Sequence, residues 1–163
     1  MRNTGKGFVN VSATAGPVFG TSLTGRGAAF GDLNNDGWID VVMATLDGAP
    51  VVLVNDGTKS TPGSAAKAGT KNHWLGLSLI GSKSNRNGIG ARVTVTDGAG
   101  RKQIFDVNTA GSYLSSNDPR IIVGLGAAAS ASKVEVRWPS GTVQVVSELQ
   151  VDRYLVINET NAR

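Results

Sequence analysis

Short apolar runs separated by turn residues are the feature that most constrains the fold of this chain. Runs such as Val41–Ala44 and Val51–Val54 end after a few residues in segments rich in Gly, Asn and Asp. Gly supplies 22 of the 163 residues and only 17% of residues are charged. A helical bundle would instead show long segments rich in Glu, Lys, Ala and Leu with a 3.6-residue period. The sequence therefore predicts an all-β fold of short strands joined by tight turns.

Composition excludes several functional classes. The chain has no Cys, so disulfide scaffolds, thiol nucleophiles and Cys-type zinc sites are not expected. No apolar run approaches the 18 or more residues that a membrane helix needs, and the first ten residues do not resemble a secretory signal. The net charge is +4, but the basic residues are scattered singly, so we expect no nucleic-acid binding and no membrane span.

The distribution of strands and turns predicts two β units. Residues 1–58 are expected to form a small antiparallel meander, residues 59–72 have the Pro, Gly, Ser and Lys composition of a linker, and residues 73–160 read as a β-sandwich or barrel. The stretch around 127–131 suits a helical turn or a loop equally well. The expected strands cover residues 27–30, 41–44, 51–54, 74–80, 91–95, 103–107, 121–123, 134–138, 143–145 and 154–157.

An acidic loop between two of these strands carries the one clear chemical signal. Oxygen-bearing side chains recur along the segment DLNNDGWID, which predicts a calcium site because Ca²⁺ takes six to eight oxygen ligands. An EF-hand is excluded, since it needs a Glu at loop position 12 and that position is Met43. An Asx-rich turn explains Asn35, Asp36 and Gly37, but three carboxylates within nine residues repel one another unless a cation neutralises them. The expected ligands are the side chains of Asp32, Asn34, Asp36 and Asp40 and the backbone carbonyl of Trp38.

Two parts of the chain resemble known families. The segment GAAFGDLNNDGWIDVVMATLDGAPVVLVNDG, about residues 25–57, resembles one FG-GAP (VCBS-type) repeat, the calcium-binding blade of integrin-like β-propellers. The segments NHWLGLSLIGSKSNRNGIGARVTVT, GSYLSSNDPR and VEVRWPSG resemble the ASPIC and UnbV domain, which follows such propellers in cartilage-acidic-protein-like and bacterial exported proteins. Residues 7–16 look like the tail of a preceding blade. The resemblance implies bound Ca²⁺, the same five ligand residues, and a secreted or periplasmic location.

The expected function follows from the loop and the resemblance. We expect a non-catalytic calcium-binding module with a structural or adhesion-like role, because no acid-base or nucleophile constellation is present. A carbohydrate-binding module or an accessory protein of a biosynthetic pathway is the alternative. A lone blade cannot bury both of its faces, so the chain is expected to be part of a longer propeller or to cover the blade with its own C-terminal domain or with a partner. That partner would be a second copy or an unidentified protein or glycan.

A few other residues have competing interpretations. His73, the single histidine, is expected to be structural, because a transition-metal site would need further ligands. Asn85, Arg86 and Arg92 fit turn chemistry and a solvated strand better than a ligand site. Aromatic faces suit pyranose rings, but Trp138 alternates in phase with apolar residues and is expected in the core rather than on a sugar-binding platform with Trp74 and Tyr113.

Overall fold

The structure is a computed structural model that describes residues 1–55, 57 and 72–160. Its only helical pieces within these residues are two 3-10 turns, η1 (Ser12–Thr14) and η2 (Pro17–Gly20). All other regular elements are strands arranged in separate sheets, none of which closes into a barrel. None of the described helices is long and apolar enough to cross a membrane. The all-β fold class predicted from the short apolar runs is confirmed.

The N-terminal part contains a small hairpin and a meander. Strands β1 (Arg2–Asn3) and β2 (Phe8–Val9) pair with each other, and β3 (Gly25–Gly31), β4 (Asp40–Thr45) and β5 (Val51–Leu53) form a three-stranded antiparallel sheet in the order β3-β4-β5. We call this second sheet the N-terminal sheet. Its β3–β4 connection, residues 32–39, together with Asp40 forms the acidic loop.

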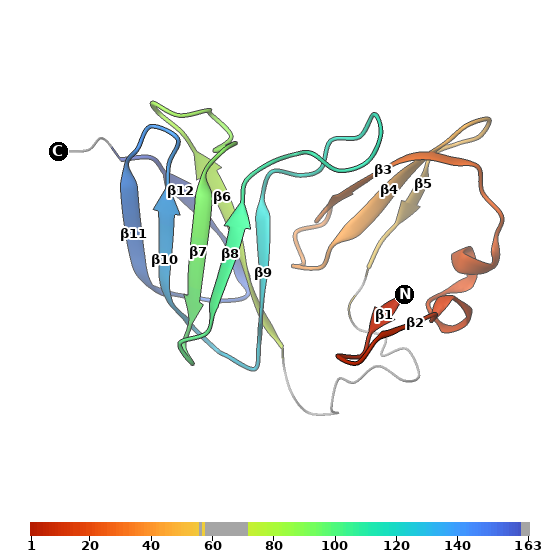
Figure 1. The fold of residues 1–163 in the computed structure, drawn as a ribbon, viewed down its shortest axis with the longest axis horizontal. Coiled ribbons are helices and arrows are strands. Elements are labelled where there is room, and N and C mark those ends of the chain that lie inside the picture. Colours follow the sequence, from red (N-terminus) through yellow and green to blue (C-terminus); the bar gives the residue numbers. More distant parts are fainter. Residues whose placement is uncertain (56, 58–71, 161–163) are drawn as a thin grey trace.

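The C-terminal part consists of two facing sheets, which we call the C-terminal sandwich (Figure 1). One sheet has four antiparallel strands in the order β11-β10-β7-β8, and the other has three strands in the order β12-β6-β9. Strand β12 pairs with β6 in parallel, an arrangement that the sequence pattern did not indicate. The strands are β6 (His73–Ile80), β7 (Arg92–Asp97), β8 (Lys102–Asp106), β9 (Ile121–Gly126), β10 (Ala131–Arg137), β11 (Val143–Leu149) and β12 (Arg153–Asn158).

The hydrophobic core lies between the two sheets of the C-terminal sandwich. Alternate residues of each strand point inward, as the period of two in a half-buried strand requires. Leu75 and Leu77 of β6 meet Val93 of β7 and Val134 of β10, and all four are fully buried. The predicted core position of Trp138 is confirmed: it is 2% exposed, and its indole N–H donates to Gln144 Oε1 at 3.1 Å.

Two segments outside the predicted strands have different outcomes. The expected linker at 59–72 lies outside the described residues except for Asn72. The stretch around 127–131 adopts the loop alternative, with one turn residue at Ala127 and strand β10 beginning at Ala131.

The connection between β8 and β9 joins the two parts of the molecule. It extends from the C-terminal sandwich to the edge of β3 (Figure 1). There the Phe30 N–H donates to Asn117 Oδ1 at 3.0 Å, and the Asp118 N–H donates to the Phe30 carbonyl at 2.9 Å. These bonds occupy backbone groups of an edge strand that would otherwise have no strand partner on that side. The acidic loop is thereby held beside the C-terminal sandwich.

Candidate functional site

The acidic loop is closed at its base by the pairing of β3 with β4. Gly31 lies opposite Asp40 in the antiparallel register, so the chain between them must reverse direction within the loop. Asn35 and Gly37 take positive φ values of 62° and 87°, which is the left-handed conformation that Asn and Gly tolerate best. The reversal therefore depends on the identity of these two residues.

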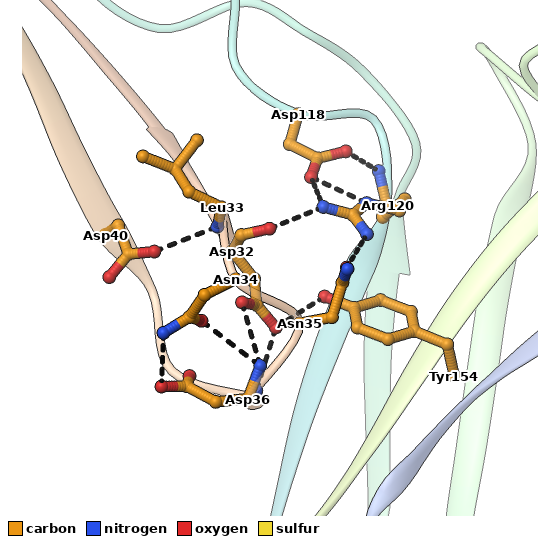
Figure 2. A network of polar contacts seen from close by, with 10 residues as sticks. Asp32, Leu33, Asn34, Asn35, Asp36, Asp40, Asp118, Arg120 and Tyr154 are labelled. Atoms are coloured by element: carbon orange, nitrogen blue, oxygen red, sulfur yellow. Dashed lines mark hydrogen bonds and ion pairs between the residues drawn. The ribbon is translucent and has the colours of Figure 1, made fainter. Parts of the chain in front are cut away.

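Within the loop, side-chain oxygens accept hydrogen bonds from the loop's own backbone. Asp32 Oδ1 accepts from the Asp36 N–H at 3.1 Å and Asp32 Oδ2 from the Gly37 N–H at 2.8 Å (Figure 2). Asn34 Oδ1 also accepts from the Asp36 N–H, and Asp36 Oδ1 accepts from the Trp38 N–H. The Asn34 amide donates to Asp36 Oδ2 at 2.8 Å. The Asx-turn chemistry weighed from the sequence is thus present throughout the loop.

Asp40 ties the acidic loop to the rest of the N-terminal sheet. It is only 1% exposed, and its two carboxylate oxygens accept from the Leu33 N–H and the Asn55 N–H, each at 2.8 Å. Asn55 follows β5, so one carboxylate links the beginning of the loop to the end of the third strand. Buried carboxylates require such donors, because burying an unpaired charge is very unfavourable.

Tyr154 of β12 and Arg120, which directly precedes β9, donate hydrogen bonds to the acidic loop. The Tyr154 hydroxyl donates to Asp32 Oδ2 at 2.8 Å. Arg120 donates from Nη2 to the Asp32 carbonyl and from Nη1 to Asn35 Oδ1, both at 2.6 Å (Figure 2). Asp118 holds the Arg120 guanidinium through Nε at 2.7 Å. Asp32 is therefore shared between its own loop and the C-terminal sandwich.

Aromatic rings complete this contact. The backbone of Gly37 lies so close to the Trp74 indole that a Cβ at this position would collide with the ring. Trp74 packs edge-on against Tyr154, with ring centroids 5.3 Å apart, and the Arg120 guanidinium lies 4.6 Å from the Tyr154 ring centroid. Arginine over an aromatic face is a favourable cation–π arrangement. The glycine, the two rings and the guanidinium thus form one continuous series of contacts.

Comparison with known families identifies the region that supplies these contacts. The model of the ASPIC and UnbV family matches residues 81–163, about half of the chain. The chain belongs to the ASPIC and UnbV family. No curated protein matches it. Arg120 and Tyr154 both lie in the ASPIC and UnbV region, whereas the acidic loop lies outside it, and the resemblance of residues 25–57 to an FG-GAP repeat stays a prediction.

The protonation equilibria follow from these contacts. Burial by itself raises the pKa of Asp32, but hydrogen bonds from Tyr154 and from the Gly37, Asp36 and Asn35 backbone outweigh it, so that pKa lies below its usual range. The hydrogen bond to Asp118 raises the pKa of Arg120. Burial, followed by the hydrogen bond to Asp32, raises the pKa of Tyr154. At neutral pH the Asp32 carboxylate is ionised, while the Tyr154 hydroxyl keeps the proton that it donates.

The donor chemistry of the acidic loop matches a hard divalent cation. Its side chains offer only carboxylate and amide oxygens, the ligand type that Ca²⁺ prefers. Asp32 and Asp40 are buried, Asp36 is half-buried and Asn34 is exposed. Each carboxylate has two oxygens and about four lone-pair positions, so the hydrogen bonds above do not use its full capacity. In this conformation the described residues contain no group of three or more His, Cys, Asp or Glu side chains arranged to hold a metal ion.

The ASPIC and UnbV region contains a cluster around a buried glutamate, which the sequence did not reveal. Glu159 is 6% exposed, and its Oε2 accepts from three consecutive backbone N–H groups, those of Ser82, Lys83 and Ser84, at 2.7–2.9 Å. The hydroxyls of Ser84 and Ser140 donate to Oε1. Burial opposes ionisation, but the Ser140 hydroxyl and these N–H groups outweigh it and hold the pKa of Glu159 well below its usual range. This cluster fixes the end of β12 to the β6–β7 turn.

The remaining predicted candidates occupy structural positions. His73 Nδ1 lies 2.9 Å from Asp152 Oδ2 at the beginning of β6. Arg92 forms an exposed ion pair with Asp106 at 2.7 Å. Because Trp138 is buried and Trp74 faces the acidic loop, neither joins the exposed Tyr113 in a shared sugar-stacking platform.

Proposed function

We propose that this ASPIC and UnbV chain is a non-catalytic calcium-binding module with a structural or protein-interaction role. The observation that carries the proposal is the identity of the buried side chains in the N-terminal part. Among residues 1–55 and 57, only Asp32 and Asp40 are buried, and both are carboxylates at the two ends of one loop. Asn34 and Asp36 lie between them, so four oxygen-bearing side chains border the same short segment.

Electrostatics support a cation at this loop. Three carboxylates held by one turn repel one another, and a divalent ion removes that repulsion while keeping each group ionised. Asp32, Asn34, Asp36, Asp40 and the Trp38 carbonyl would hold it, and Ca²⁺ would supply charge neutralisation and stiffness rather than chemistry. Extracellular modules bind Ca²⁺ with dissociation constants of about 10⁻⁴–10⁻³ M. Such affinity suits a secreted or periplasmic location, and we include that location in the proposal.

The N-terminal sheet also supports a protein-interaction role. Phe30 lies in the same cross-strand row as Val41, whereas Val52 lies on the opposite face, yet Phe30 is 45% exposed and Val52 is 52% exposed. A sheet with apolar side chains on both faces is typical of a layer covered on both sides. We therefore include association with another protein layer in the proposed role.

Calorimetric and thermal titration with CaCl₂ tests the proposal. Calcium at about ten times its dissociation constant is expected to stabilise the folded chain by roughly 1.4 kcal/mol, seen as a higher Tm. Asp36→Ala should abolish that rise, because Asp36 is a proposed ligand whose side chain accepts hydrogen bonds from Asn34 and Trp38 of the same loop. Asp47→Ala, which removes an exposed carboxylate from a neighbouring turn, is the matched control and should keep the rise. An equal rise in Asp36→Ala, or no rise in the unaltered chain, contradicts calcium binding at this loop.

A further inference from the structure

We propose that Tyr154 and Arg120 form a latch that makes the conformation of the acidic loop depend on its docking to the C-terminal sandwich. The latch would couple the shape of residues 32–40 to the attachment of the N-terminal sheet, through two residues that lie far from the loop in the sequence. Its effect on cation affinity rests on the function proposed above, whereas its effect on loop conformation does not.

The N-terminal part has little apolar burial to stabilise it. No apolar side chain among residues 1–55 and 57 is buried. Apolar burial is the dominant favourable contribution to folding, so a segment without it must be stabilised by other contacts. Contacts between the acidic loop and the C-terminal sandwich are therefore candidates for this stabilisation.

The Tyr154 hydroxyl contacts an oxygen that also belongs to the internal bonding of the acidic loop. Asp32 Oδ2 accepts from both the Tyr154 hydroxyl and the Gly37 N–H, each at 2.8 Å. One oxygen thus belongs at once to the internal bonding of the loop and to the contact with the sandwich. Undocking removes the Tyr154 donor from a carboxylate that is 1% exposed in the docked state. The loop must then rearrange or admit water to that carboxylate.

Asp118 orients the Arg120 side chain toward the acidic loop. The backbone N–H and the Nε of Arg120 both donate to Asp118, at 2.9 Å and 2.7 Å, so the guanidinium is held in place. Nη2, which also contacts Asp118, reaches the Asp32 carbonyl, and Nη1 reaches the Asn35 side chain. These two acceptors are adjacent only when the loop is turned as described. A planar, pre-oriented guanidinium recognises such a pair with little loss of side-chain freedom.

Two glycines allow the N-terminal sheet to approach the C-terminal part closely. A Cβ at Gly27 would collide with the Tyr113 carbonyl and the Ser115 hydroxyl, and one at Gly37 would collide with Trp74. Close approach of two backbones is a use for which glycine is suited. The N-terminal sheet therefore meets the β8–β9 connection and strand β6 in one closely fitted position.

Native-state hydrogen exchange tests the latch without any metal. Tyr154→Phe removes only the hydroxyl donor, and Asn35→Gly removes an Arg120 acceptor while keeping a residue that tolerates positive φ. In both variants the amides of residues 33–38 are expected to exchange about tenfold faster or more. Tyr154→Phe loses a hydrogen bond to a charged group, and Asn35→Gly loses the acceptor that Arg120 contacts in the latch. Exchange in β7 and β10 should stay unchanged. Arg92→Gln, which breaks an exposed ion pair elsewhere, is the control and should leave residues 33–38 as they are.

Unchanged exchange at residues 33–38 in both variants overturns the latch. If Tyr154→Phe fails to fold, Asn35→Gly decides alone, since it alters only the exposed side of the loop. Faster exchange throughout the chain in Asn35→Gly also overturns the latch, because the loop would then stabilise the sandwich generally rather than depend on docking.

Calcium titration separates this inference from the proposed function. If the unaltered chain binds Ca²⁺, Tyr154→Phe is expected to bind it about tenfold more weakly, because groups that orient a ligating carboxylate contribute to metal affinity. If docking strengthens Ca²⁺ binding, Ca²⁺ must by linkage favour the docked state, so exchange at the interface should slow when Ca²⁺ is bound. Equal affinity in Tyr154→Phe overturns the coupling and leaves calcium binding intact. No calcium binding by the unaltered chain overturns the proposed function, and the metal-free exchange result then decides the latch.

Discussion

The N-terminal sheet and the C-terminal sandwich are both built from short strands, but different interactions stabilise them. Every buried apolar side chain among the described residues lies between Leu75 and Ile157, whereas the N-terminal part buries only Asp32 and Asp40. The sandwich is held by packed Leu, Val and Trp side chains. The N-terminal sheet is held by its strand pairing, by carboxylates that accept backbone N–H groups, and by contacts with the sandwich. Two regions with similar strand patterns can therefore differ in how much their stability depends on contacts with the rest of the chain.

The largest expected difference between the two regions comes from truncating one leucine in a strand of each. Leu77 is fully buried in β6, whereas Leu53 in β5 is half-buried. Leu77→Ala is expected to cost about 2–5 kcal/mol of the free energy of unfolding, through lost transfer energy and the remaining cavity. Leu53→Ala should cost less than about 1.5 kcal/mol, because less apolar surface leaves water. Urea unfolding of both variants measures the difference, and equal costs would show that the N-terminal sheet has a covered face.

The pH dependence of stability should come from both regions, with Glu159 as the main contributor in the sandwich. Because the folded-state pKa of Glu159 lies below its ordinary value of 4.5, its ionised form contributes stability that is fully present above that pH and is lost as the pH falls. Glu159→Gln places an amide donor against backbone donors, so it should destabilise the chain at neutral pH and flatten the acid side of the stability profile.

Urea unfolding from acid to neutral pH measures the Glu159 effect. Glu148→Gln, which alters an exposed glutamate of β11, is the matched control and should keep the acid side of the profile. An identical pH profile for Glu159→Gln and the unaltered chain would show that the hydrogen-bonded cluster contributes nothing to the pH dependence.

The smallest effect on global unfolding is expected from the glycine that contacts Trp74. Gly37→Ala combines the strain of a positive φ, about 1–3 kcal/mol, with a collision against the indole, and should act on the N-terminal sheet alone. Gly100→Ala, at a similar φ of 83° in open space within the sandwich, carries the strain without the collision. Hydrogen exchange should show faster exchange over β3 and β4 in Gly37→Ala only. Loss of protection in β7 and β10 in that variant would mean that the two regions unfold together.

Much of the local structure could be predicted from the sequence because its causes are local. The runs Val41–Ala44 and Val51–Val54 become β4 and β5, and the alternation around Val93 and Val95 becomes β7 with those side chains in the core. A period of two and a turn residue act over a few positions, so they are visible in the chain. The acidic loop was recognised for the same reason.

The contacts around the loop could not be predicted in this way. Tyr154 lies 122 residues from Asp32, and Arg120 lies 88 residues from it. Neither residue belongs to a motif that points to the loop, although Arg120 stands in the quoted segment GSYLSSNDPR. The parallel pairing of β12 with β6, which places Tyr154 beside Gly76, also has no signal in the local pattern.

The amino-acid sequence by itself determined the all-β class, the positions of most strands and the presence of an oxygen-rich loop, because these depend on backbone preferences and side-chain period. The tertiary structure alone decided that Asp32 is buried against Tyr154 and Arg120, and that the N-terminal sheet keeps its apolar side chains partly exposed. Burial and long-range hydrogen bonds arise only when distant segments meet, and their energies depend on that meeting rather than on any neighbouring residue.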